Sequence, residues 1–219
     1  MYDRFLFVGL GGSGGSTIGY LKREIQKWLR ENNVKHADNV PVGWQFLHID
    51  TPAISDANPR LADNEYLGLV NVGLNYNAVQ SLLDVNPDLH DELQTWRVDP
   101  TAMPVPLATG AGQFRALGRT IAMAYANTIR TALGASISKL SEDRVETELS
   151  ELYFTVTGQP ARTGKSRLFV VVVSSLAGGT GAGLLCTVCD ILRAMGTDAE
   201  HNVFGVLYTP EVFSMLGDV

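Results

Sequence analysis

The sequence predicts an α/β fold of the Rossmann-like, doubly wound type, with a mainly parallel sheet and helices on both faces. Residues 168–174 form an apolar run rich in valine, which is typical of a strand buried on both faces, as in a parallel sheet. Short strand-like runs alternate with longer helical patterns along the chain, an order that favours a doubly wound sheet. Glycine-rich turns follow two of the runs, at the positions where such sheets bind ligands.

The first half of the chain contributes two strands and one helix to this prediction. Residues 4–9 and 43–49 are short apolar runs that predict strands. Between them, a glycine loop at 9–15 leads into an amphipathic helix, predicted over 14–31. The polar segment 52–107 contains Asn-Pro and Asp-Pro steps that interrupt long helices, so we expect an insertion that decorates one face.

The second half contributes further helices and two strands. Leu117, Ile121 and Ala124 repeat at helical spacing in an alanine-rich stretch, which predicts one long helix. The other expected elements are a helix at 146–152, an extended segment at 152–156, strands at 168–174 and 203–208, and a helix at 184–195.

Composition indicates one domain over residues 1–219. The chain has 219 residues, of which 45% are hydrophobic and 18% charged, enough to bury one sizeable core. A net charge of −6 excludes a broad basic surface for nucleic acid. Its apolar runs are shorter than the roughly 20 residues that span a bilayer, and the start of the chain does not resemble a signal peptide. We therefore expect no transmembrane segment and a cytoplasmic location.

Two cysteines form a CxxC pattern that would suit a metal or redox site. Cys186 and Cys189 have no cluster of further ligands in the sequence, because the four histidines are scattered. We expect both cysteines to be small apolar residues that pack against the sheet, and we expect no metal site.

The two glycine-rich turns predict a phosphate site. Glycines in the turn after residues 168–174 allow close approach of a ligand to the backbone, and the following helix directs amide groups and a positive dipole end at it. Near the N-terminus, Gly9, Gly11 and Gly14 satisfy GxGxxG, a pattern shared by dinucleotide-binding and adenylating enzymes. Taken alone, such glycines can also serve only to pack a helix closely on a strand.

Four motifs in order resemble those of the tubulin/FtsZ superfamily. GLGGSGGSTI at 9–18 resembles its first phosphate loop, and AGGTGAG at 177–183 resembles its glycine signature. TGAGQFRALGR at 109–119 resembles its third loop, and FGVLYTPEVF at 204–213 resembles the strand and loop near the ribose. The resemblance implies the GTPase-domain fold of that superfamily.

The resemblance also implies a set of nucleotide-binding residues in these turns. Asp50 and Thr51 align with a polar loop that faces the nucleotide, although the acidic residue is displaced by one position, and Arg115 and Arg119 are candidates for charge neutralisation. The residues implied to bind nucleotide are Gly11, Gly12, Ser13, Gly14, Gly15, Asp50, Thr51, Gly110, Ala111, Gly112, Gly178, Gly179, Thr180, Gly181, Ala182, Gly183, Thr209 and Glu211.

Departures from the family pattern indicate a divergent bacterial tubulin-like branch. Ala177 and Ser16 replace a usual glycine and asparagine, and the connections at 52–107 and 136–165 are longer than in FtsZ. In the superfamily, part of the guanine recognition and the acidic hydrolysis loop come from segments that would follow Val219. We therefore expect this chain to be the nucleotide-binding half of a larger protein, incomplete at its C-terminus, with no catalytic residue assigned.

The function implied by the resemblance is binding of GTP or GDP, with or without Mg²⁺, and GTP hydrolysis coupled to head-to-tail self-assembly into filaments. Two alternatives stay open. One is a Rossmann enzyme that binds NAD or ATP through GLGGSG, although Asp50 lies much farther from the glycines than the roughly 20 positions that such sites favour. The other is a noncatalytic tubulin-like scaffold.

Overall fold

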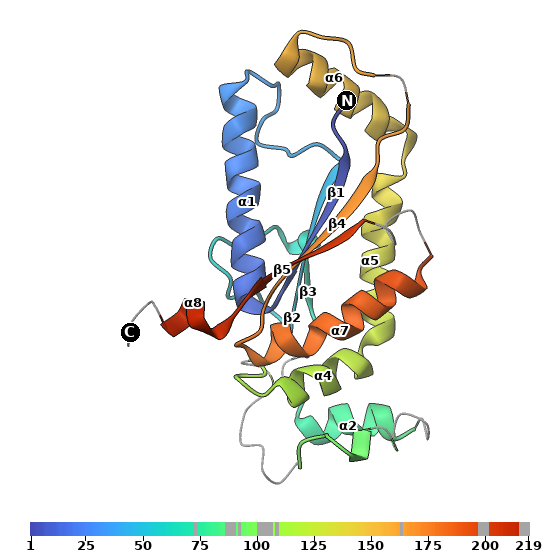
Figure 1. Cartoon of the computed structure of the whole chain (residues 1–219). Helices are drawn as coiled ribbons and strands as arrows, with labels where there is room; N and C mark the ends of the chain where they lie inside the picture. The colour runs from blue at the N-terminus through green and yellow to red at the C-terminus, as the bar shows by residue number, and fades with distance from the viewer. Residues whose placement is uncertain are drawn as a thin grey trace.

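The protein is built around one sheet of five parallel strands (Figure 1). The computed structural model describes residues 1–71, 74–85, 91, 93–99, 107, 110–162, 164–196 and 202–214. The strands are β1 (Arg4–Leu10), β2 (Trp44–Asp50), β3 (Tyr66–Gly68), β4 (Leu168–Ser175) and β5 (Val203–Tyr208). Their spatial order is β3-β2-β1-β4-β5, so the chain reverses its winding direction between β1 and β4. The predicted doubly wound α/β fold is confirmed.

Helices cover both faces of this sheet. On one face, the wholly buried side chains of Leu6, Val8 and Val172 pack under α5 and α7, and side chains of α4 belong to the same core cluster. On the other face, Phe46 and Val173 pack against Ile18 of α1. Figure 1 shows α1 on one side of the strands and α5 and α7 on the other. The helices are α1 (Gly11–Glu31), η1 (Asp63–Glu65, a 3-10 turn), α2 (Tyr76–Asp84), α4 (Arg115–Ala124), α5 (Ala126–Leu140), α6 (Asp143–Thr157), α7 (Gly179–Ala194) and α8 (Pro210–Ser214).

The long helix expected over 116–133 is in fact two helices. α4 ends at Ala124, Tyr125 leaves helical geometry with φ −107° and ψ 18°, and α5 continues to Leu140. Hydrogen bonds flank the break on both sides, from the Tyr125 amide to Ile121 and from the Ile129 amide to Tyr125. The apolar stripe passes through the break, so periodicity alone could not reveal it.

The extended segment expected at 152–156 is wrong, because α6 runs through it to Thr157. The hydroxyls of Thr155 and Thr157 donate to the carbonyls of Glu151 and Tyr153, one turn back in the same helix. Gly158 ends the helix in the left-handed region with φ 69°. Threonine is common in strands, but here its hydroxyl is satisfied within a helix.

Other predicted boundaries also move. The segments read as glycine loops are largely the first turns of α1 and α7, which begin at Gly11 and Gly179. β3 was not predicted, because a strand of three residues is too short to show periodicity, yet it pairs with β2 from within the segment 52–107. Cys186 and Cys189 are exposed on α7 and do not pack against the sheet. In the part of the chain that the structure describes, no helix is long and apolar enough to cross a membrane.

Candidate functional site

Three glycine turns meet at the carboxyl edge of the sheet, beside the switch point between β1 and β4. We name them the first turn (residues 9–15), the middle turn (110–112) and the signature turn (178–183). A β-carbon added to Gly11 would lie 2.9 Å from the amide nitrogen of Gly181, so the first and signature turns touch. The amide of Gly179 donates to the carbonyl of Gly112 at 2.7 Å, which joins the middle turn to the signature turn. Segments far apart in the sequence thus form one continuous surface.

One group of glycines in these turns is required for packing. A β-carbon on Gly14 would lie 2.4 Å from the carbonyl oxygen of Val173, and one on Gly183 would lie 2.4 Å from the amide nitrogen of Arg119. These distances are too short for any side chain. The packing interpretation considered for the sequence therefore holds for these positions, which let α1 and α7 approach neighbouring backbone closely.

A second group of glycines faces open space. An added β-carbon would meet nothing within 4 Å at Gly178 or Gly110, and only one side-chain atom, at 3.8–3.9 Å, at Gly12 or Gly112. Gly110 and Gly112 have φ of +105° and +54°, conformations that favour glycine. Packing does not explain the absence of side chains at Gly12 and Gly178.

The open glycines lie beside the N-termini of two helices, where the Gly179 amide donates to Gly112 and the amides that follow have no side-chain cap. α1 begins after Leu10 and α7 begins after Gly178, and neither N-terminus has a side-chain cap or an acidic residue in its first turn. The first amides of a helix have no partner within it, and they carry the positive end of the dipole. Two such N-termini side by side can bind an anion such as a phosphate. Ser13 and Ala182 lie in these first turns and are partly exposed.

A buried polar cluster lies behind the turns at the end of β2. Asp50 is 4% exposed; its Oδ1 accepts from the Thr51 amide at 2.7 Å, and its Oδ2 lies 3.5 Å from His48 Nε2. Thr51 Oγ1 lies 3.0 Å from Thr180 Oγ1 in the signature turn. Burial, and next the negative charge of Asp50, raise the pKa of the nearby Tyr66 phenol well above its usual value.

His48 belongs to this cluster, although it was not singled out in the sequence. Its ring is wholly buried and occupies the space that a side chain on Gly15 would need. Two-residue spacing in a strand places His48 and Asp50 on the same face, immediately before a polar loop. That spacing is a signal by which the pair could have been found.

The remaining candidates lie farther out. Thr209 and Glu211 are exposed after β5. The pKa of Glu211 is lowered mainly by a hydrogen bond with the Thr209 side chain and to a smaller extent by a backbone hydrogen bond. Figure 1 shows α8, which contains Glu211, projecting away from the sheet. The guanidinium of Arg119 lies over the ring of Trp96, 5.2 Å from its centroid. No group of three or more histidine, cysteine, aspartate or glutamate residues within the described ranges could hold a metal ion.

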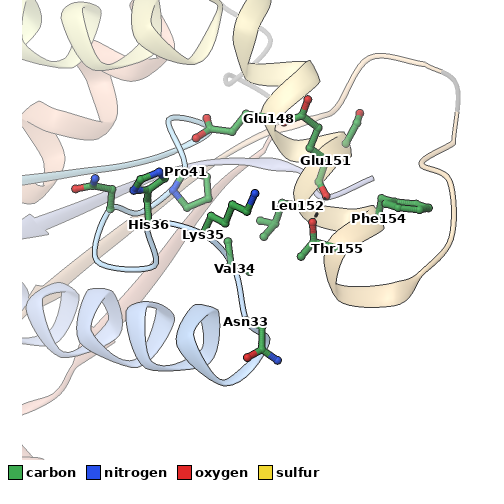
Figure 2. Close-up of a pocket in the computed structure, with 12 residues that line it drawn as sticks. Asn33, Val34, Lys35, His36, Pro41, Glu148, Glu151, Leu152, Phe154 and Thr155 are labelled. Atoms are coloured by element: carbon green, nitrogen blue, oxygen red, sulfur yellow. Dashed lines mark hydrogen bonds between the residues drawn. The ribbon is translucent and has the colours of Figure 1, made fainter.

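A large cavity lies elsewhere, at the amino end of the sheet. It has a volume of about 890 Å³ and lies between α6 and the segment that joins α1 to β2 (Figure 2). Lys35, Glu148 and Leu152 are among its lining residues, which include no glycine. Size alone would select this cavity, but phosphate chemistry favours the glycine turns, because they combine open backbone with two helix N-termini.

Comparison with known proteins agrees with the sequence motifs and the fold. No curated protein matches the chain. A family described as tubulin-like matches residues 6–218. That range includes β2 to β5, all but the first two residues of β1, and all three glycine turns. The resemblance to the tubulin/FtsZ superfamily is thereby confirmed, and the chain belongs to the tubulin-like family.

Proposed function

We propose that this chain binds GTP and GDP through the first, middle and signature turns. The observation that carries the proposal is the pair of uncapped helix N-termini, those of α1 and α7, with open glycines beside them. Because the chain has a net charge of −6, phosphate affinity would come from backbone amides and helix dipoles, with little help from overall charge. Membership of the tubulin-like family supports the choice of a guanine nucleotide.

Each turn has its own part in this proposal. Amides of the first and signature turns hold the phosphates, and the middle turn closes over the terminal phosphate. Asp50 and Thr51 support the polar side of the site, and Thr209 and Glu211 contact the ribose. A Mg²⁺ ion would take most of its ligands from phosphate oxygens and water, as this ion usually does with nucleotides.

We further propose that GTP hydrolysis accompanies head-to-tail self-association. A head-to-tail contact uses two different surfaces and therefore propagates into filaments. The described residues contain no assigned acid or base for hydrolysis, so the proposal requires a group from another subunit or segment. GTP turnover per chain should then rise with protein concentration, and pelleting in the presence of GTP should reveal filaments.

Calorimetric titration with GTP, GDP, ATP and NAD tests the proposed binding site. The variant Gly178→Val places a side chain in open space, at a φ of −83° that valine adopts readily, so the fold should survive. We expect the wild type to prefer guanine nucleotides and Gly178→Val to lose at least about tenfold in affinity, a loss of about 1.4 kcal/mol.

A matched control is Gly205→Val in β5, where an added β-carbon meets only a leucine atom at 3.9 Å. This control should bind GTP like the wild type. Preference for NAD or ATP would instead support the Rossmann enzyme, and binding of none of the four would support the scaffold. Equal affinity of Gly178→Val and the wild type would contradict the proposed site.

A further inference from the structure

A series of buried polar contacts connects all three glycine turns behind the proposed phosphate site. The connection begins at the carbonyl oxygen of Gly11, the first residue of α1, which lies 3.1 Å from Nε2 of His48. The same nitrogen lies 3.5 Å from Asp50 Oδ2. His48 therefore bridges the first turn and the end of β2.

The partners of His48 are consistent with one tautomer. The amide of Ala57 donates to Ser55 Oγ at 3.3 Å, and Ser55 Oγ lies 3.3 Å from His48 Nδ1. If the Ser55 hydroxyl donates to Nδ1, then Nε2 carries a proton and donates to the Gly11 carbonyl, with Asp50 Oδ2 3.5 Å away. Every polar atom of the imidazole is then satisfied without a ligand.

From Asp50 the connection continues to the other two turns. The Asp50 carboxylate accepts the Thr51 amide at 2.7 Å, and Thr51 Oγ1 lies 3.0 Å from Thr180 Oγ1 in the signature turn. Thr180 Oγ1 also accepts the amide of Ala111, in the middle turn, at 3.4 Å. We call this set of six residues, Gly11, His48, Asp50, Thr51, Thr180 and Ala111, the buried relay.

The relay has little freedom to absorb a displacement. His48, Thr51 and Ala111 are wholly buried, Gly15 packs closely against the His48 ring, and Gly11 packs closely against the backbone of Gly181. Hydrogen bonds in such surroundings are strong, and leaving one unmade is costly. A movement of the middle turn should therefore be transmitted to Thr180, Thr51 and the first turn.

We propose that the buried relay couples the middle turn to the first turn, with His48 as the positioning residue, so that the site distinguishes a nucleoside triphosphate from a diphosphate. This inference rests on the proposed function, in which the middle turn closes over the terminal phosphate. Because coupling between sites is reciprocal, the relay also links the terminal phosphate to the amides of α1 that hold the rest of the nucleotide.

The ratio of GTP affinity to GDP affinity measures this coupling. Thr51→Val removes the hydroxyl at nearly constant size, and we expect the ratio to fall about fivefold or more, the lower range of ordinary couplings. Thr51→Ser keeps the hydroxyl and should restore the ratio. Thr17→Val is the matched control, because Thr17 Oγ1 bonds Ser13 and Tyr208 outside the relay, and it should leave the ratio unchanged.

Variants of His48 test the other half of the relay. His48→Leu removes both ring nitrogens and should lower the same ratio, whereas His48→Gln retains an amide donor for Gly11 and should recover part of it. Combining His48→Leu with Thr51→Val should lower the ratio no further, because both break one connection. Two results would overturn the proposed coupling: equal losses of affinity for GTP and GDP in the single variants, or strictly additive effects on the ratio in the double variant. Neither result would contradict the proposed nucleotide site itself.

Hydrogen exchange tests the relay even without nucleotide. The amide of Ala111 depends on Thr180 Oγ1, so it should exchange faster in His48→Leu than in the wild type, although the two residues do not share a hydrogen bond. Unchanged exchange at Ala111 would overturn the inference. A wild type that binds no guanine nucleotide but shows this remote effect would overturn the proposed function and, with it, triphosphate discrimination.

Discussion

The two ends of the central sheet differ in how their backbone polar groups are satisfied. At the amino end, the buried Arg4 donates to the carbonyls of Leu140 and Ser166 at 3.0 and 2.7 Å, and Glu146 accepts the amide and hydroxyl of Ser166. At the carboxyl end, the N-termini of α1 and α7 have no side-chain cap. At the amino end, side chains thus complete the backbone hydrogen bonding between elements. At the carboxyl end, side chains join the turns from behind, and the helix N-termini in front of them have no side-chain cap.

This difference explains why the large cavity beside α6 is a poor guide to the proposed site. The cavity beside α6 lies at the end where side chains supply the polar groups. At the glycine turns the donors belong to the backbone and are fixed by the helices. Separate perturbation of the two ends tests whether one is structural and the other functional.

The largest expected effect is from Gly14→Ala at the carboxyl end. Its β-carbon would lie 2.4 Å from the Val173 carbonyl and 3.0–3.2 Å from Gly9, all of them backbone atoms that cannot rotate away. We expect a loss of about 3 kcal/mol or more in the free energy of unfolding, measured by urea denaturation. Gly12→Ala in the same turn meets only an Asp56 atom at 3.9 Å and should retain wild-type stability. Similar losses in both variants would disprove the division into packed and open glycines.

Arg4→Met should give the next largest effect, at the amino end. The substitution leaves the carbonyls of Leu140 and Ser166 without their buried donor, which we expect to cost about 2–3 kcal/mol. Affinity for GTP, compared at a temperature where the variant is folded, should be unchanged because the nucleotide turns lie at the opposite end. A large loss of affinity would show that the two ends are coupled.

Tyr66→Phe should give a smaller, pH-dependent effect. The phenol donates to the carbonyl of Pro52, and burial with the Asp50 charge raises its pKa in the folded state. A raised pKa in the folded state means that folding favours the neutral phenol. The phenol therefore stabilises the fold fully below the pKa of the unfolded chain, about 10, and this stabilisation declines at higher pH. The wild type should exceed the variant by about 1 kcal/mol at pH 8. Urea denaturation should show this difference shrinking as the pH rises above 10, and a constant difference would contradict the assignment.

Arg167→Met should have the smallest effect. Arg167 pairs with Asp3 at 3.0 Å near the amino end, but its side chain is 72% exposed. We expect a loss below about 1 kcal/mol, because exposed ion pairs contribute little. Comparing this loss with that of Arg4→Met shows how the same substitution depends on burial. A larger loss of stability from Arg167→Met than from Arg4→Met would contradict the expected importance of burial.

Much of the site was predictable from the sequence, because glycine patterns report directly on backbone requirements. The first, middle and signature turns were each identified from neighbouring residues, and they meet at one edge of the sheet as the alternating order implies. The roles of individual glycines were not predictable. Gly178 and Gly179 are adjacent in one motif, yet one faces open space and the other packs against the carbonyls of Ala111 and Gly112.

By itself, the sequence determined the doubly wound α/β fold class, the positions of the three glycine turns and the net negative charge, since these depend on local pattern and composition. The tertiary structure decided the break at Tyr125, the pairing of β3 and the buried relay through His48. These features depend on contacts between residues far apart in the chain, such as Thr51 with Thr180. Long-range contacts leave no periodic signal, so only the folded chain reveals them.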